Sequence, residues 1–110
     1  MIVRASELFL PTLRDDPADA EAVSHKLLVR GGYIRQVGAG LWTYMPLGWR
    51  VHRKVEQIIR EELDAIGAQE LFMPVLTPVE LWEATSRAGI PEIFHLQDRS
   101  GRRYILPVTH

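Results

Sequence analysis

Few residues in this 110-residue sequence have the types and spacing of a catalytic centre. The sequence contains no cysteine, which excludes a disulfide, a thiolate metal site and a cysteine nucleophile. His25 is isolated within a predicted helix, so a packing or surface role is favoured over a chemical one. Arg99, Arg102 and Arg103 belong to a turn-like stretch and are interpreted as solvated charges rather than ATP ligands. Function must therefore be inferred from the elements that organise the sequence.

The glycines on either side of Ala39 do not form a phosphate-binding loop. They lack the lysine and the spacing of either common nucleotide-binding fingerprint. The flanking residues, Tyr33 to Val37 and Leu41 to Met45, are predicted to form two short strands joined by a tight turn. Trp42 and Tyr44 then share one face of the second strand, where core or interface packing is favoured over a platform for stacking bases.

The composition bounds the class of protein. Hydrophobic residues make up 46% of the sequence, which is enough for a core and argues against disorder. The net charge of -1 argues against a protein that is basic overall and binds nucleic acid, although a local basic patch is compatible with it. The apolar runs are too short to span a bilayer, and the amino terminus is not a signal peptide. The composition therefore predicts a cytoplasmic protein with no membrane partner.

The stretch from Pro46 to Pro78 organises the sequence. Apolar residues at helical intervals predict one long amphipathic helix, and these are Val51, Val55, Ile58, Ile59, Leu63 and Ile66. Gly67 is predicted to end the helix, and a continuous apolar run from Leu71 to Leu76 follows, as in a buried strand. Pro74 has no amide proton, so this strand cannot pair regularly on both sides. An interface is one use for such a strand.

The charges of this helix are ordered against its dipole. The basic residues come first and the acidic residues last: Arg50, Arg53 and Lys54, then Glu61, Glu62 and Asp64. Two interpretations stay open. The helix face is solvated and has partners within the chain, or two copies of the helix pair antiparallel about a two-fold axis.

Two shorter helices are predicted on either side of the organising stretch. The first begins with Asp16 as its N-cap and Pro17 in the first position, and the glycines at 31–32 end it. The second follows Thr77, which forms a capping box with Glu80.

The two ends of the sequence are less regular. Residues 1–10 fit either a strand or a short helix. Ile93 to Leu96 and Arg103 to Val108 are predicted strands of a hairpin, with a turn from Gln97 to Gly101. The run ends at Thr109-His110 without a terminal helix, which suggests a truncated chain.

Three segments in order cover nearly all of the sequence, and together they identify a family. They read LFLPTLRDDPADAEAVSHKLLVRGGYIRQVGAGLWTYMPLGWRV, REELDAIGAQELFMPVLTPVELW and LQDRSGRRYILPVTH. Their concatenation resembles the amino-terminal part of bacterial-type prolyl-tRNA synthetases, which are class II aminoacyl-tRNA synthetases. The resemblance implies an α+β fold: part of a class II catalytic domain, with an antiparallel sheet, flanking helices and a long first-motif helix followed by an interface strand. Residues 1–110 are then the amino-terminal portion of that domain, without motifs two and three or the anticodon-binding domain.

The resemblance also implies site residues. The family's first motif has an invariant proline that matches Pro74, and this motif forms the dimer interface, which implies a homodimer with Phe72, Met73 and Pro74 at the contact. Thr109 and His110 match the first two positions of the family's Thr-His-Glu stretch, which binds the substrate proline. By resemblance, the Thr109 hydroxyl and the following glutamate hold the ammonium group, a chemistry suited to oxygen acceptors.

The function implied by the resemblance is ligation of proline to its tRNA. L-Proline is activated by ATP to prolyl-adenylate, and the prolyl group is then transferred to tRNA(Pro). The arginines and the acidic residues that bind ATP and Mg²⁺ belong to the family's later motifs, so no catalytic residue and no metal ligand is expected within residues 1–110. The chain alone is expected to be inactive, because each such electrostatic contact is typically worth about 3 kcal/mol at the transition state.

Two departures from the family pattern are visible. Pro107-Val108 stand where most relatives have Gly-Pro, which predicts a different pocket geometry just before Thr109. Relatives commonly have Ser-Gly-Arg after the tryptophan and a somewhat longer loop, whereas here Trp82 is followed by Glu83-Ala84-Thr85-Ser86-Arg87 and a shortened loop. This loop is predicted to close differently over the site.

Two alternatives compete with this interpretation. One is a non-catalytic dimerisation module or paralogue that kept the first motif. The other is a different class II synthetase, such as the threonyl enzyme, against which the Thr109-His110 ending and the LGWRV helix entry argue.

Overall fold

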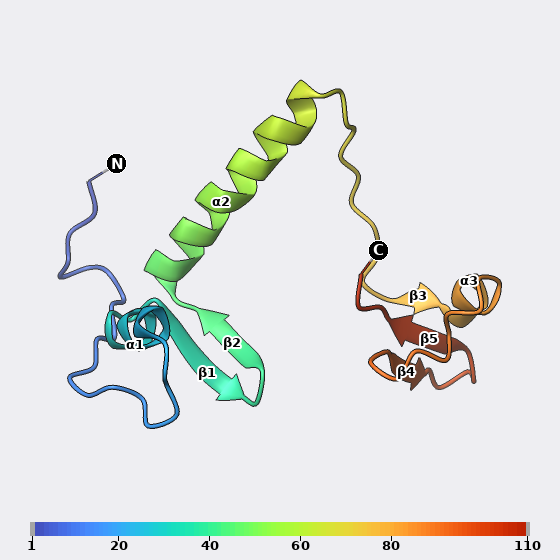
Figure 1. Ribbon diagram of the computed structural model, residues 1–110, viewed down its shortest axis with the longest axis horizontal. Coiled ribbons are helices and arrows are strands. Elements are labelled where there is room, and N and C mark those ends of the chain that lie inside the picture. The colour runs from blue at the N-terminus through green and yellow to red at the C-terminus, as the bar shows by residue number, and fades with distance from the viewer. Residues whose placement is uncertain (1, 110) are drawn as a thin grey trace. The chain divides into compact units, whose positions relative to one another are not determined.

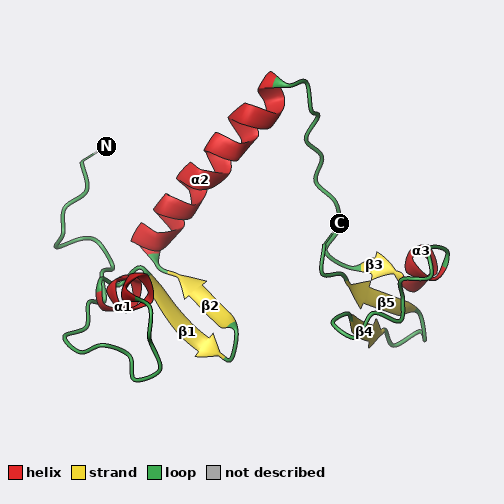
Figure 2. Cartoon of the chain, in the orientation of Figure 1, coloured by secondary structure: helices red, strands yellow, loops and turns green. Residues whose placement is uncertain are grey.

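The computed structural model describes residues 2–109, and the chain divides after Gln69 into two compact units. The elements are α1 (Val23–Arg30), β1 (Ile34–Gly38), β2 (Leu41–Tyr44), α2 (Pro46–Ala65), β3 (Thr77–Pro78), α3 (Val79–Glu83), β4 (Phe94–Gln97) and β5 (Arg103–Leu106) (Figures 1 and 2). All strand pairs are antiparallel within the described residues. The predicted α+β class is therefore confirmed.

The hairpin of the first unit matches its prediction. β1 and β2 pair with Ile34 opposite Tyr44 and Gln36 opposite Trp42, and the register shifts by one residue before Gly38. Gly40, the second residue of the turn, has a φ of 72°, a left-handed conformation that glycine adopts without strain.

The start of α1 differs from its prediction. Asp16 was expected to cap the helix, but α1 begins at Val23 and Ala22 occupies the N-cap position without a side-chain hydrogen bond. The Asp16 carboxylate instead lies 3.3 Å from Arg30 and 3.9 Å from Lys26, so it pairs with cations from later turns of the helix. The end of α1 matches its prediction, since Gly31 is the C-cap.

Residues 2–10 are neither strand nor helix; the segment before α1 is held by hydrogen bonds to backbone groups instead. The Leu13 amide donates to the carbonyl of Arg30 at 2.8 Å. The Arg35 guanidinium donates to the carbonyls of Val29 and Pro11. Arg35 therefore joins the hairpin, α1 and the amino-terminal segment through charge-assisted hydrogen bonds.

The long helix α2 leaves the hairpin at a close backbone contact. The Met45 amide donates to the carbonyl of Tyr33 at 2.8 Å, and Pro46 occupies the first turn, where proline fits best. Gly48 is buried, and a Cβ atom at this position would overlap the Tyr33 carbonyl oxygen. Gly67 follows the helix with a φ of 82°, as predicted.

The second unit contains a small sheet in the order β3-β5-β4. Its core consists of Val79, Ile93 and Ile105, against which Trp82, Ala88 and Ile90 pack. β5 is the central strand, and the fully buried Ile105 lies opposite both Thr77 and His95. The predicted terminal hairpin is confirmed, but β5 ends at Leu106 rather than Val108, where Pro107 removes an amide donor.

The predicted capping box at Thr77 is wrong. Thr77 belongs to the short strand β3, and Pro78 is the N-cap of α3 without a side-chain hydrogen bond. The Thr77 hydroxyl accepts a hydrogen bond from the Trp82 indole at 3.0 Å and donates to the carbonyl of Ile105 at 3.5 Å. Tertiary hydrogen bonds thus occupy the oxygen that the local pattern assigned to the helix terminus.

The predicted buried strand from Leu71 to Leu76 is absent. These residues have no regular secondary structure in the described chain, and all six are exposed. A strand buried on both faces requires neighbours that pair with its backbone and cover its side chains, and the described residues of this unit supply neither.

The hairpin turn of the second unit is organised by Asp98. Its carboxylate accepts hydrogen bonds from the amides of Ser100 at 2.8 Å and Arg102 at 2.9 Å, and from the Arg102 Nε at 2.7 Å. These hydrogen bonds hold the pKa of Asp98 below its ordinary value of 3.8. The bond from the Arg102 amide lowers it most, and the bonds from the Arg102 side chain and the Ser100 amide lower it further. Gly101 closes the turn with a φ of 81°.

Gly48→Ala is expected to destabilise the first unit by about 1–3 kcal/mol, although alanine has the higher helix propensity, because the added methyl group overlaps the Tyr33 carbonyl. Gly38→Ala is the control, since its Cβ would meet only the Leu41 side chain, at 3.4 Å. Chemical denaturation followed by circular dichroism measures both variants. Equal losses of stability would contradict the close contact at Gly48.

Asp98→Asn is expected to destabilise the second unit at neutral pH and to have a smaller effect in acid. The folded-state pKa of Asp98 lies below 3.8, so its charge stabilises the fold above that pH, and this contribution is lost as pH falls through the folded-state value. Thermal melting of parent and variant from pH 7 to pH 2 measures the difference. A difference in melting temperature that stays constant across this range would contradict the assignment.

Candidate functional site

The apolar stripe of α2 is uncovered in the first unit. Its residues follow the predicted positions, and each is about half exposed or more: Val51, Val55, Ile58, Ile59, Leu63 and Ile66. Only the start of the helix packs closely, where Val51, His52 and Val55 meet Tyr33 and Leu28 around a small hollow. A stripe of this length, left open to water, is typical of a surface that another element covers.

The segment Leu71–Leu76 is a second uncovered surface, in the other unit. Phe72 is 98% exposed, and Leu71 and Val75 are each about two-thirds exposed. No hydrogen bond between backbone groups is described for the amides or carbonyls of these six residues. An extended backbone without hydrogen-bond partners, flanked by exposed apolar side chains, is a template for pairing with another chain segment.

The predicted interface residues lie in this second surface. Met73 is less exposed than Phe72 and lines a hollow with Thr77, Leu81 and Trp82. Pro74 follows at once and cannot donate to a neighbouring strand. Phe72 projects its ring into solvent. Their arrangement fits an interface strand that pairs on one side only, and it remains a prediction that a second copy supplies the partner.

The predicted substrate-binding residues lie beyond the central strand. Thr109 is exposed, three residues after the end of β5, and it is not among the residues that line the hollow at Met73. His110 lies outside the described residues. Thr109 therefore follows the carboxyl end of β5, and it does not share the hollow that Met73 lines.

The loop after Trp82 is strained at one position. Ser86 has a φ of 57°, in the left-handed region that favours glycine. A serine in this conformation has a conformational cost that a glycine would avoid.

The arginines of the second unit's hairpin are exposed, as interpreted from the sequence. Arg102 pairs with Asp98 at 2.7 Å, and Arg103 pairs with Glu83 of α3 at 2.9 Å. Both guanidinium groups thus have acidic partners within the unit. His25 packs its ring edge-on against Trp42 at 5.2 Å, as expected for a packing role.

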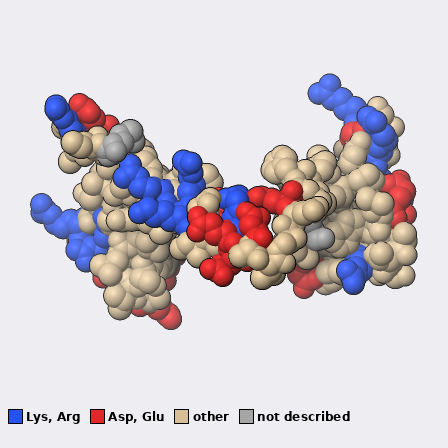
Figure 3. Space-filling model, turned by 90° about the horizontal axis from the view of Figure 1, so that it is seen from above, with Lys and Arg blue, Asp and Glu red and all other residues tan. Residues whose placement is uncertain are grey.

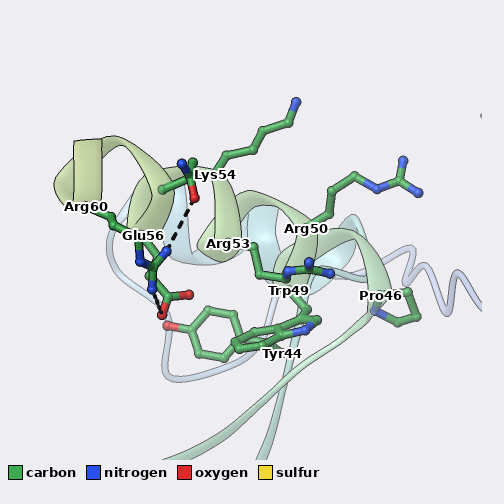
Figure 4. Close-up of a pocket in the computed structure, with 9 residues that line it drawn as sticks. Tyr44, Pro46, Trp49, Arg50, Arg53, Lys54, Glu56 and Arg60 are labelled. Carbon is green, nitrogen blue, oxygen red and sulfur yellow. Dashed lines mark hydrogen bonds and ion pairs between the residues drawn. The ribbon is translucent and has the colours of Figure 1, made fainter. Parts of the chain in front are cut away.

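A hollow along α2 escaped the sequence interpretation. It has a volume of about 830 Å³ and is lined by Tyr44, Pro46, Trp49, Arg50, Arg53, Lys54, Glu56, Gln57 and Arg60 (Figure 4). The signal for its cationic side was present in the three- and four-residue spacing of the basic residues. The contribution of Tyr44 was not visible, because this residue comes from β2.

Metal and membrane sites were also considered. Among residues 2–109, no three side chains of histidine, aspartate or glutamate converge as a metal site would require. Of the helices described, none has the length and hydropathy to cross a membrane.

Known proteins resemble this chain closely in sequence. No family model matches it. It is 54% identical over 110 residues to the proline–tRNA ligase of Acidithiobacillus ferrooxidans, 57% identical over 111 residues to that of Streptomyces coelicolor, and 58% identical over 112 residues to that of Nocardioides sp.. These matches cover 98%, 99% and 100% of this chain but only 19%, 20% and 19% of the relatives. The chain thus spans about a fifth of the length of its curated relatives, and the predicted resemblance to prolyl-tRNA synthetases is confirmed.

Replacing Phe72 and Val75 together by Asp is expected to weaken association of the chain by about tenfold or more per site, because each buried apolar side chain contributes about 1.5–3 kcal/mol. The control replaces Phe9 and Val37 by Asp, since these residues are of the same types and are also exposed, at 64% and 71%, in the first unit. Sedimentation velocity over a range of concentrations measures the effect. If both pairs of substitutions act alike, Leu71–Leu76 is not the contact surface.

Proposed function

We propose that this chain is the amino-terminal part of a proline–tRNA ligase, which activates L-proline with ATP and transfers the prolyl group to tRNA(Pro). The observation that supports this most directly is the identity of 54–58% to such ligases over nearly the whole chain. In this proposal the protein acts in the cytoplasm, where tRNA is charged.

The class II architecture is part of the proposal. Its support is the order of elements: the twenty-residue helix α2, its stop at Gly67, and then the uncovered apolar segment with Pro74. A homodimer would pair Leu71–Leu76 with a second copy and bury Phe72 and Met73. Because Pro74 donates no hydrogen bond, pairing would use the amides on either side of it.

The role proposed for Thr109 concerns the substrate amine. Its exposed hydroxyl follows the rigid central strand β5 and can accept a hydrogen bond from the ammonium group of proline. His110 and the residue after it would complete this side of the pocket. ATP and Mg²⁺ would be bound by residues outside the 110 described by this sequence.

The chemistry of proline activation indicates which part of the reaction these residues would support. Attack of the proline carboxylate on the α-phosphate requires alignment of two anionic groups, and catalysis of this type depends on positioning and charge stabilisation. In this proposal residues 2–109 would supply a subunit contact and one side of a substrate site, whereas Arg102 and Arg103 at the hairpin are paired with acids. This chain is therefore proposed to position the substrate rather than to stabilise the transition state.

A chimera tests the proposal. Residues 1–110 replace the matching segment of the Streptomyces coelicolor ligase, and proline-dependent exchange of pyrophosphate into ATP is measured. Activity within about tenfold of the parent ligase is expected, a change of no more than about 1.4 kcal/mol in the barrier. A chimera that dimerises but shows no exchange would support the alternative of a dimerisation module. Exchange with threonine instead of proline would support another synthetase.

Thr109→Val in that chimera is expected to raise the proline KM about 5- to 100-fold and to leave the ATP KM unchanged, since loss of one polar contact costs about 1–3 kcal/mol. Thr12→Val is the matched control, because Thr12 is exposed and lies in the other unit. An unaltered proline KM would remove Thr109 from the substrate site.

A further inference from the structure

The hollow along α2 lies on the helix face opposite the apolar stripe. Positions 50, 53, 54, 57 and 60 recur at helical intervals, so their side chains share one side of the helix. Figure 4 shows the labelled side chains leaving α2 and the end of β2, with Arg50 and Lys54 extended away from the helix. This surface is separate from the exposed apolar residues discussed as an interface.

Three cations of the hollow have no acidic partner among the residues that the structure describes. Arg50, Arg53 and Lys54 are exposed, and no hydrogen bond or ion pair of their side chains is described within residues 2–109. Glu56 does not neutralise them, because its carboxylate pairs with Arg60 at 3.5 Å. The hollow therefore attracts anions.

Aromatic rings form the other part of the hollow. Tyr44 and Trp49 are each about half exposed. His52 stacks on Trp49 at a centroid distance of 5.1 Å and meets Tyr44 edge-on at 5.0 Å. This three-ring cluster holds the rings in place while leaving part of their surface open. Exposed aromatic faces beside cations are suited to stacking a nucleobase.

The length of the basic face favours an extended ligand. Arg50 and Arg60 are ten residues apart, which corresponds to about 15 Å along a helix. A single phosphate contacts only one end of such a row, whereas a nucleic-acid backbone presents one charge per nucleotide along it. In the space-filling view, blue basic and red acidic side chains lie next to one another over this face of the molecule (Figure 3).

We propose that this hollow binds a single-stranded segment of RNA, with Arg50, Arg53 and Lys54 on the phosphates and a base stacked on Trp49 or Tyr44. The choice of RNA over another polyanion rests on the proposed function, in which a tRNA is a substrate. The binding itself rests on the unpaired cations and the aromatic cluster. The competing occupant is the acidic end of α2 from a second copy, which offers charge but no flat aromatic partner for Trp49.

The test is binding of a fluorescent single-stranded RNA of about 12 nucleotides to the 110-residue chain, measured by anisotropy at several salt concentrations. Replacing Arg50, Arg53 and Lys54 by Gln is expected to weaken binding by about tenfold or more at low salt. The slope of log affinity against log salt concentration should fall by about 2, as expected for three lost phosphate contacts. Trp49→Ala should weaken binding about fivefold or more without changing that slope.

The matched control replaces Arg4, Arg14 and Arg99 by Gln, which removes the same charge from exposed positions elsewhere. Binding by this variant should stay within about twofold of the parent. A charge-preserving variant, Arg50→Lys with Arg53→Lys, should keep both affinity and salt slope. Circular dichroism establishes that each variant retains its helix content.

Three outcomes would overturn the proposal. The first is that the control variant loses as much affinity as the site variant. The second is that ATP or tripolyphosphate competes as well as unlabelled RNA, which indicates a free-nucleotide site. The third is that the site variant loses self-association while RNA binding is unchanged, which assigns the cations to contact with a second copy. The assay needs no aminoacylation, so its result is independent of whether the chimera is active. An inactive chimera with intact RNA binding would contradict the proposed function alone.

Discussion

The contact between Gly48 and the Tyr33 carbonyl determines where the long helix leaves the hairpin. The Met45 amide donates a hydrogen bond to that same carbonyl, so the residue before α2 and the first turn of α2 both contact one oxygen atom. Glycine allows the first turn of α2 to approach the backbone of the hairpin, and Pro46 fixes the entry of the helix. The aromatic cluster of Tyr44, Trp49 and His52 forms across this junction. The junction therefore sets the direction of α2 and the geometry of the basic hollow together.

Beyond the junction, the two units expose the surfaces that a larger assembly would cover. The apolar stripe of α2 and the segment Leu71–Leu76 both face solvent, whereas the buried core of the second unit is limited to Val79, Ile93 and Ile105. A small core contributes little free energy of folding, and exposed apolar surface of this extent is usually completed by other chain segments. The match to about a fifth of the length of the curated relatives agrees with this dependence.

The charge order of α2 can now be compared with its two interpretations. Glu56 and Arg60, four residues apart on the helix, form an ion pair at 3.5 Å, so part of the face is neutralised within the helix. Arg50, Arg53 and Lys54 have no such partner described, and aromatic rings lie beside them. Aromatic rings favour a ligand with bases over a purely acidic protein surface. Tyr44, which packing arguments assigned to a core or an interface, is thus half exposed as well.

The sequence by itself determined the elements whose causes are local. Helical spacing predicted α2, glycines predicted its end and that of α1, and turn residues predicted both hairpins, because each depends on neighbours within a few positions. The family resemblance also came from the sequence, through the order of its motifs. Thr77 and Asp16 were misassigned because both are good caps by local pattern, yet their oxygens bond to Trp82 and to Arg30. Only the tertiary structure could decide which partners these oxygens bond to, because folding brings those partners close and the local sequence pattern does not show it.

The same reason explains the two remaining differences. Leu71–Leu76 has the composition of a buried strand, but a strand is formed by its partners, and the described residues of its unit provide none. The basic hollow needed Tyr44 of β2 beside Trp49 of α2, a proximity that follows from the junction at Gly48 and that no spacing along the helix contains. Local chemistry fixed the helices and the turns, whereas packing between elements decided which side chains share a surface.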